Sequence, residues 1–436
     1  MSRWAGGPVG KGAGGDPSAL LARIGAVVLL AHLPTGPLAA QASIHAQAIP
    51  LVTTAWHMPG DEATLTEFAV VQPAVMLEWR SPWSRPGTPS FLARATLDGE
   101  GLTIADGELS PGSHGEGFYD RRHPHTYVHE LVIGGSDLLG VLDGKWRISA
   151  AGGPKGFVAF GTDDPMSRPP VRYPVNHHLS QILERALVMG SVGYGPVTFE
   201  ATWFNGDEPT HPSDWPNWER AFDSHAFRGT VTPIPGLEAQ LSYAKVLSPE
   251  HEGGAGPTQE KWDASIRYQG QLADVPTYFL AEWARTEDAG GFFVYHSFLA
   301  EGAVELGRHR PYARLELTER PEEMRTADPF RSVRPHTDDN LLGITDWTVL
   351  TAGYGVSFLT AKGRLELRPF IEGSVAHVSV VEGLVDPELF YGSDVLPSLS
   401  LGVRMDWGGM NKMRMGRYGT GPEAAGQVHP EHSGHH

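Results

Sequence analysis

A run of histidines and acids between residues 114 and 130 is the part of this sequence best equipped to bind a metal. Residues 118–130 read Phe-Tyr-Asp-Arg-Arg-His-Pro-His-Thr-Tyr-Val-His-Glu. Imidazole nitrogens and carboxylate oxygens are ligands for Zn²⁺ and Cu²⁺. No His-Glu-x-x-His occurs, and Pro124 prevents a regular helix through the paired histidines, so this is not the metalloprotease motif. The candidate ligands in this run are His114, His123, His125, His129 and Glu130.

A plainer interpretation of the same run stays open. It could be a polar loop leading into a strand, in which Asp120, Arg121 and Arg122 form ion pairs at the surface. Under this interpretation the histidines bind nothing, and the loop serves only to connect two strands.

The C-terminal tail is the second place where residue types suggest metal chemistry. It contains Met410, Met413 and Met415, and four histidines follow between residues 429 and 436. Thioether and imidazole groups together suit copper. The alternative is a solvated, disordered terminus whose histidines are incidental. We therefore expect no cofactor, with a copper or zinc ion as the alternative.

Catalytic motifs are lacking elsewhere in the sequence. It has no Gly-x-Ser-x-Gly, which marks the nucleophile of many hydrolases. The glycine-rich run at 152–156 lacks the Lys-Ser/Thr pair of a phosphate-binding loop. We therefore expect that this protein is not an enzyme.

The elements that would position these residues are strands. Residues 397–407 alternate strictly, with apolar residues at odd positions and small or polar residues at even ones. A period of two is typical of a β-strand with one apolar face, and roughly 9–11 residues suffice to cross a bilayer as a tilted strand. The same alternation recurs at 197–203, 237–243, 262–268 and 365–371.

Lipid offers no partners for backbone polar groups, so strands that cross a membrane must close into a barrel. The face opposite the apolar stripe then lines a water-filled lumen. The predicted lumen residues comprise seven acids and five bases: Glu200, Glu238, Asp263, Arg267, Glu282, Arg314, Glu316, Arg364, Glu366, Arg368, Arg404 and Asp406. This near balance predicts at most a weak preference for cations.

Connections between the predicted strands are alternately short and long, which is the layout of an outer-membrane barrel. Eleven strands are evident after residue 186. Five weaker candidates precede them, at 74–80, 90–98, 102–107, 127–134 and 138–150. The fold class is therefore all-β, a transmembrane antiparallel up-and-down barrel of about sixteen strands, with fourteen or eighteen as alternatives.

The N-terminus resembles a secretory signal. Basic residues precede the apolar stretch 24–30, and Ala40-x-Ala42 has the small residues of a cleavage site. The predicted layout is a signal peptide at 1–42, a periplasmic lead-in at 43–67, the barrel at 68–408 and a disordered Met/His-rich tail at 409–436. Without the signal the formal charge of −17 becomes about −19, which argues against nucleic-acid binding.

The His-rich run also carries a resemblance. Asp120-Arg-Arg-His-Pro-His125 resembles the Asp-Arg-x-His-Pro-His segment of a family of uncharacterised bacterial outer-membrane barrel proteins. The similarity extends through Asp164-Pro-Met-Ser-Arg-Pro-Pro170 and Gly193-Tyr-Gly-Pro-Val197 to Leu247-Ser-Pro-Glu250. The resemblance implies a porin-like barrel in the outer membrane. It implies no particular activity, although some members are associated with metal handling.

Three functions follow from these observations. The first is a porin-like channel for passive diffusion of small hydrophilic solutes, narrowed by an infolded loop. The second is a barrel that binds or handles copper or zinc. The third is a closed structural or adhesive barrel. The expected partners are outer-membrane lipid and small hydrophilic solutes, and a trimer is one possible assembly.

Overall fold

A computed structural model describes most of the chain after residue 41. The described residues are 42–57, 64–80, 90–104, 125–136, 146–162, 165–175, 177–209, 211–249, 253–323, 341–360, 364–408 and 414–418. Nearly all of the predicted signal peptide, residues 1–41, lies outside these ranges, so that assignment stays a prediction.

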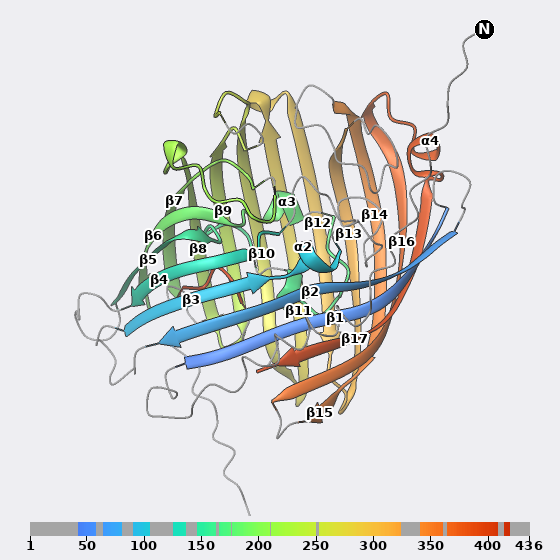
Figure 1. Ribbon diagram of the computed structural model, residues 1–436, viewed down its shortest axis with the longest axis horizontal. Helices are drawn as coiled ribbons and strands as arrows, with labels where there is room; N and C mark the ends of the chain where they lie inside the picture. Colours follow the sequence, from blue (N-terminus) through green and yellow to red (C-terminus); the bar gives the residue numbers. More distant parts are fainter. Residues whose placement is uncertain are drawn as a thin grey trace, which may run out of the picture. The chain divides into compact units, whose positions relative to one another are not determined.

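The strands form one closed antiparallel sheet. Each strand pairs with its neighbours in the sequence, and β1 also pairs with β17, which closes the ring. Figure 1 shows these first and last strands, blue and red, lying side by side. The strands are β1 (Ala42–Trp56), β2 (Thr64–Arg80), β3 (Ser90–Asp98), β4 (Val128–Ser136), β5 (Trp146–Gly156), β6 (Arg185–Tyr194), β7 (Val197–Phe204), β8 (Ser224–Ile234), β9 (Leu237–Leu247), β10 (Thr258–Leu272), β11 (Val275–Asp288), β12 (Phe293–Val304), β13 (His309–Glu323), β14 (Leu341–Val356), β15 (Phe358–Thr360), β16 (Leu365–Gly383) and β17 (Val395–Trp407).

The predicted barrel of sixteen strands is confirmed. Only Ser357 separates β14 from β15, and both pair with β16, so together they form one wall strand. Counted in this way, the seventeen named strands make a closed barrel of sixteen. A barrel of this size has room for an aqueous interior, whereas eight strands are filled by their own side chains.

The wall is apolar outside and polar inside. In β9, Glu238, Gln240 and Ser242 are buried, whereas Leu241 between them is 57% exposed. Phe199 in β7 is likewise 52% exposed. A soluble protein buries its apolar residues, so this arrangement is reversed, as it must be in a barrel that spans a lipid bilayer.

Connections of different length lie at the two ends of the barrel. The turns between β6 and β7, β8 and β9, and β10 and β11 are only two residues long. We call this end the short-turn end. The connections at the other end, the long-loop end, include residues 205–223, 248–257 and 384–394. Successive connections lie at opposite ends because neighbouring strands are antiparallel.

The predicted periplasmic lead-in at 43–67 is wrong. Residues 42–56 form β1, and residues 64–67 belong to β2. The inward face of β1 carries Ile49 and Leu51, which pack against Ala69 and Phe370. Because these apolar residues share the inward face with the polar His45, Gln47 and Thr53, the alternation that revealed the other strands is interrupted here.

The predicted strand at 102–107 is also wrong over its described part. Glu100–Thr103 forms the short helix α2, and residues 105–107 lie outside the described ranges. The backbone N–H of Glu100 donates to the side chain of Asp98, at 2.7 Å, which turns the chain away from β3. The predicted number of sixteen strands is nevertheless right, because one predicted strand is not a strand and one real strand, β1, was not predicted.

The described part of the loops contains five further short helices: η4 (Pro165–Ser167), α3 (His177–Ser180), η5 (Trp218–Arg220), η6 (Ala289–Gly291) and α4 (Pro387–Tyr391). Among the described residues, no helix is long and apolar enough to cross a membrane.

Candidate functional site

The interior of the barrel is rich in buried charge. Ten of the twelve predicted lumen residues are buried on the inward face of the wall, and Glu366 is half-buried. Arg364 differs, because it lies in the turn before β16 and is exposed. The ten buried residues are Glu200, Glu238, Asp263, Arg267, Glu282, Arg314, Glu316, Arg368, Arg404 and Asp406.

Many of these charges are paired across neighbouring strands. Arg228 of β8 donates to both carboxylate oxygens of Glu200 in β7, at 2.6 and 3.0 Å. Arg314 of β13 donates to Glu301 of β12 at 2.6 Å. Arginine can hold a carboxylate with two parallel hydrogen bonds, and such charge-assisted bonds are the stronger kind. The wall charges therefore hold one another in place.

A segment of the chain between β5 and β6 passes through this interior. We call residues 157–184 the infolded segment. Near its start, the backbone N–H of Ala159 donates to Thr202 of β7, and that of Gly161 donates to Ser242 of β9. Thr162 then donates to Glu282 of β11. The segment thus leaves the β5–β6 side of the barrel and reaches strands on the far side.

Wall charges bind the backbone of the second half of the infolded segment. Glu372 of β16 accepts from the N–H groups of Val171 and Arg172, both at 2.8 Å. Glu316 of β13 accepts from the N–H of Val175 at 2.6 Å. Arg404 of β17 donates to the carbonyls of Met166 and Arg168. These charges therefore support a folded segment inside the barrel as well as each other.

A second segment enters the interior from the C-terminus. We call residues 414–418 the C-terminal segment, and all five are buried. Arg414 donates to both carboxylate oxygens of Glu238, at 3.2 and 3.1 Å. The Gly416 N–H donates to Glu130 at 3.3 Å, and the Tyr418 hydroxyl accepts from the N–H of Phe157 at 2.7 Å. The C-terminal segment therefore contacts both the wall and the start of the infolded segment.

This arrangement corrects the prediction of a disordered tail at 409–436 for the five described residues. It also places Met415, one of the predicted copper ligands, in an apolar cluster with Met76, Phe157 and Met166. Met410 and Met413 lie outside the described residues, as do residues 419–436. The sulfur of Met415 thus has a packing role, which an unbranched thioether fills well.

Two of the predicted metal ligands meet at the long-loop end. A register shift between Thr96 and Leu97 leaves His129 as an extra residue in β4. Such a bulge lets two successive side chains face the same side. His129 and Glu130 are accordingly both fully buried. His125 precedes β4, and its ring lies edge-on to that of His129, with ring centroids 4.8 Å apart.

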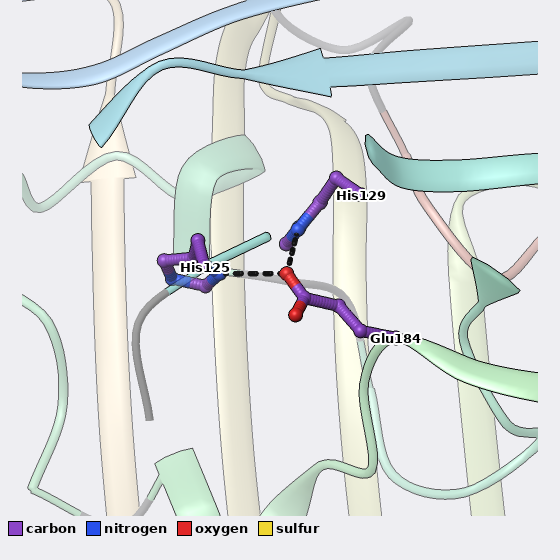
Figure 2. Close-up of side chains that lie close together, drawn as sticks. All are labelled: His125, His129 and Glu184. Carbon is purple, nitrogen blue, oxygen red and sulfur yellow. Dashed lines mark hydrogen bonds and ion pairs between the residues drawn. The ribbon is translucent and has the colours of Figure 1, made fainter. Parts of the chain in front are cut away.

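Glu184 completes a cluster that the sequence did not reveal. Figure 2 shows one of its carboxylate oxygens facing both imidazoles. The oxygen lies 3.4 Å from Nδ1 of His125 and forms a short hydrogen bond with Nδ1 of His129. The same carboxylate accepts from the backbone N–H of Thr126, at 2.9 and 3.1 Å. We call His125, His129 and Glu184 the His/Glu cluster; their ligand atoms all lie within 4.8 Å of one another.

The backbone of Glu184 is unusual. Its φ angle is +60°, in the left-handed region that side chains other than glycine seldom adopt. Such a conformation costs of order 1–3 kcal/mol and persists where surrounding contacts hold it. The hydrogen bonds to its carboxylate supply those contacts.

Electrostatics favours charged forms in the His/Glu cluster. Burial raises the pKa of Glu184, but the charge of His129 and hydrogen bonds from both histidines outweigh it, so the pKa lies well below its usual value. Burial lowers the pKa of His125, but its hydrogen bond to Glu184 and the charges of Glu100, Glu184 and Asp98 raise it well above the usual value. The cluster is thus a buried site in which positive and negative groups stabilise each other.

The remaining predicted ligands do not join this cluster. Glu130 points to other partners, because its carboxylate accepts from Thr96 and from the N–H of Gly416. His114 and His123 lie outside the described residues. Glu184 is distant from the histidines in the sequence, and no local motif marks it. The pairing of β4 with β5 and of β5 with β6 brings it beside them.

A cavity of about 900 Å³ lies at the long-loop end beside the His/Glu cluster. Glu184 is part of its lining, together with residues of the 205–219 loop. The charged lining residues include five acids (Glu184, Asp207, Glu208, Asp214 and Glu219) but only two bases (Lys155 and Arg185). The cavity is therefore acidic overall.

Comparisons with known proteins show only a likeness of fold. No protein-family model matches the chain, and no curated protein matches its sequence. Similar solved structures include the anion-selective porin from Comamonas acidovorans, with 8% identity over 84% of this chain and 99% of that one, at a TM-score of 0.48. The outer membrane channel DcaP of Acinetobacter baumannii gives 8% identity, coverage of 86% and 99%, and a TM-score of 0.47.

A third similar structure is OmpF of Salmonella typhi in complex with daunomycin, with 9% identity over 83% of this chain and 97% of that one, at a TM-score of 0.44. At these identities and scores, no argument about function rests on the likeness. The resemblance through the Asp-Arg-x-His-Pro-His segment likewise stays a prediction.

Proposed function

We propose that this protein is a porin-like channel of the bacterial outer membrane that passes small hydrophilic solutes by passive diffusion. The observation that carries the proposal is the closed barrel with an apolar outer face and a charged inner face. Charges removed from water cost free energy, so a charged inner face is more favourable where the interior also holds water. Such an interior suits a path through which polar solutes move.

The path would be narrow. The infolded segment and the C-terminal segment both occupy the interior and hydrogen-bond to its wall. Solutes must therefore pass between these segments and the wall, or displace one of them. The proposal is accordingly a channel of small conductance rather than a wide pore.

Ion selectivity should be weak. The wall residues predicted from the sequence are mainly acidic, but both interior segments bring arginines. Among the described residues, thirteen acids and sixteen lysines and arginines are buried. This balance leaves little net charge to favour ions of either sign, so the weak cation preference predicted from the sequence should be close to none.

Planar-bilayer recordings of the purified, refolded full chain test the proposal. The expected result is small, stepwise conductance with a reversal potential near zero in a KCl gradient. The matched comparison is a chain that ends at Gly408 and so lacks the C-terminal segment. If neither protein conducts, the channel is excluded and a closed structural barrel is favoured. Strong selectivity would overturn the charge argument alone.

A further inference from the structure

We propose that His125, His129 and Glu184 form a binding site for a divalent transition-metal ion, of which Zn²⁺ is the best-suited probe. The inference goes beyond the channel function and does not depend on it. Two imidazoles and a carboxylate are a usual ligand set for Zn²⁺, and they leave a fourth position for water or another ligand.

The distances in the His/Glu cluster suit such an ion. Bonds of about 2.0–2.2 Å in a tetrahedral site place ligand atoms about 3.3 Å apart. Nδ1 of His125 and the nearer oxygen of Glu184 are 3.4 Å apart. Nδ1 of His129 lies closer to that oxygen, because the two share a hydrogen bond. Binding would release the Nδ1 protons of both histidines to water, and rotation of the side chains would widen the spacing of this pair.

The carboxylate of Glu100 lies beside the imidazole ring of His125. Nε2 of His125 lies 3.7 Å from a carboxylate oxygen of Glu100 in α2, while Nδ1 of the same ring faces Glu184. A ligating histidine usually directs its second nitrogen to a carboxylate or carbonyl, which fixes the ring and makes it a stronger ligand. Glu100 is placed for that role and leaves Nδ1 directed at the proposed site.

The acidic cavity offers a route for the ion. Glu184 belongs both to the His/Glu cluster and to the cavity lining, so the site adjoins a space of about 900 Å³. Five acids against two bases raise the local concentration of cations in that space. An ion arriving at the long-loop end would therefore reach Glu184 first.

Binding would also fasten the infolded segment. His129 belongs to β4 in the wall, whereas Glu184 is the last residue of the infolded segment before β6. An ion held by both joins the wall to that segment. Zn²⁺ should therefore raise the resistance of the folded protein to denaturant, since ligands that bind only the folded state stabilise it.

Calorimetric titration of the refolded full chain with Zn²⁺ tests the site. The tail also contains histidines, so the decisive quantity is the binding lost in the double variant His125→Ala/His129→Ala. We expect the loss of one binding event per chain. Loss of a residue that holds a metal ligand in place costs about 10–100-fold in affinity, so Glu100→Gln should cost about tenfold. Glu184→Gln alters a ligand itself and should cost at least as much. His211→Ala, which alters an exposed histidine of the same cavity, is the matched control and should bind as the wild type does.

A spectroscopic readout covers the case in which the double variant does not fold. Co²⁺ bound by nitrogen and oxygen in a four-coordinate site gives visible absorption bands, which should appear in the wild type and disappear in Glu184→Gln. Circular dichroism checks that this variant remains a barrel. Unchanged Zn²⁺ affinity and unchanged Co²⁺ bands in Glu184→Gln would overturn the site. Channel conductance plays no part in either readout, so failure of the site and failure of the channel are distinguishable.

Discussion

The two segments inside the barrel differ in how they are attached. The infolded segment is joined to a wall strand at each end, β5 before it and β6 after it. The C-terminal segment follows β17 in the chain, and its other links to the wall among the described residues are hydrogen bonds and packing. A segment fixed at both ends is part of the folded barrel. One fixed at a single end can leave the lumen without unfolding any strand.

The largest effect should follow from removing the C-terminal segment. A chain that ends at Gly408 keeps every wall strand but loses the bonds that Arg414 and Gly416 make to Glu238 and Glu130. We expect a several-fold larger single-channel conductance. Water that enters the emptied space can hydrogen-bond the groups left behind, so thermal stability should change little. Equal conductance with and without the segment would show that it does not obstruct the path. Heat-dependent mobility on gels is the control for folding.

Two glycines provide a matched test of the same difference. Gly161 in the infolded segment has φ +65°, and a Cβ there would lie 1.7 Å from the carbonyl oxygen of Ser180. Gly416 in the C-terminal segment has φ +68°, and a Cβ there would lie 3.0 Å from the side-chain Cβ of Phe157. Left-handed backbone alone costs an alanine about 1–2 kcal/mol.

Gly161→Ala should therefore lower the free energy of unfolding by more than about 1–2 kcal/mol. The clash of the new Cβ with the carbonyl of Ser180 adds to the cost of the left-handed conformation. Gly416→Ala should instead release the C-terminal segment, raising conductance while stability changes little. Urea unfolding and bilayer recordings of both variants separate the two outcomes. If Gly416→Ala destabilised the barrel as much as Gly161→Ala, the proposed difference in attachment would be wrong.

The sequence predicted the wall far better than its contents. The strands after residue 186 sort polar and apolar residues by face, and that signal is local. β1 was missed because Ile49 and Leu51 face inward and pack against Val71 and Phe370. The same face also carries the polar His45, Gln47 and Thr53, so the alternation is broken and gives only a weak signal.

The contents of the lumen depend on contacts between distant parts of the chain. Glu184 lies 55 residues from His129, and Arg414 lies 176 residues from Glu238. No spacing rule links such pairs. The sequence did identify His125 and His129 as candidate ligands, since two histidines in one short run are a local feature. It could not identify their acidic partner.

A smaller effect should follow from weakening one anchor of the infolded segment. Glu372→Ala leaves the N–H groups of Val171 and Arg172 without their present acceptor. An unpaired buried donor costs about 1–3 kcal/mol, so the free energy of unfolding should fall by about 2–6 kcal/mol unless water enters. Glu372→Gln retains one acceptor oxygen and should cost roughly half as much. Urea denaturation measures both, and equal losses in the two variants would contradict the role given to the two carboxylate oxygens.

The smallest effect concerns Met415 and decides between packing and copper binding. Its side chain packs with Met76, Phe157 and Met166 in the apolar cluster that joins the C-terminal segment to the wall. Leucine has nearly the same volume, so Met415→Leu should change stability by less than about 1.5 kcal/mol. Because leucine has no sulfur, a copper site that used Met415 would lose a ligand. We expect Cu⁺ affinity, measured by competition with a chromogenic chelator, to be the same in the variant as in the wild type. A clear fall in that affinity would restore Met415 as a ligand, and it would mean that the C-terminal segment leaves the lumen when copper binds.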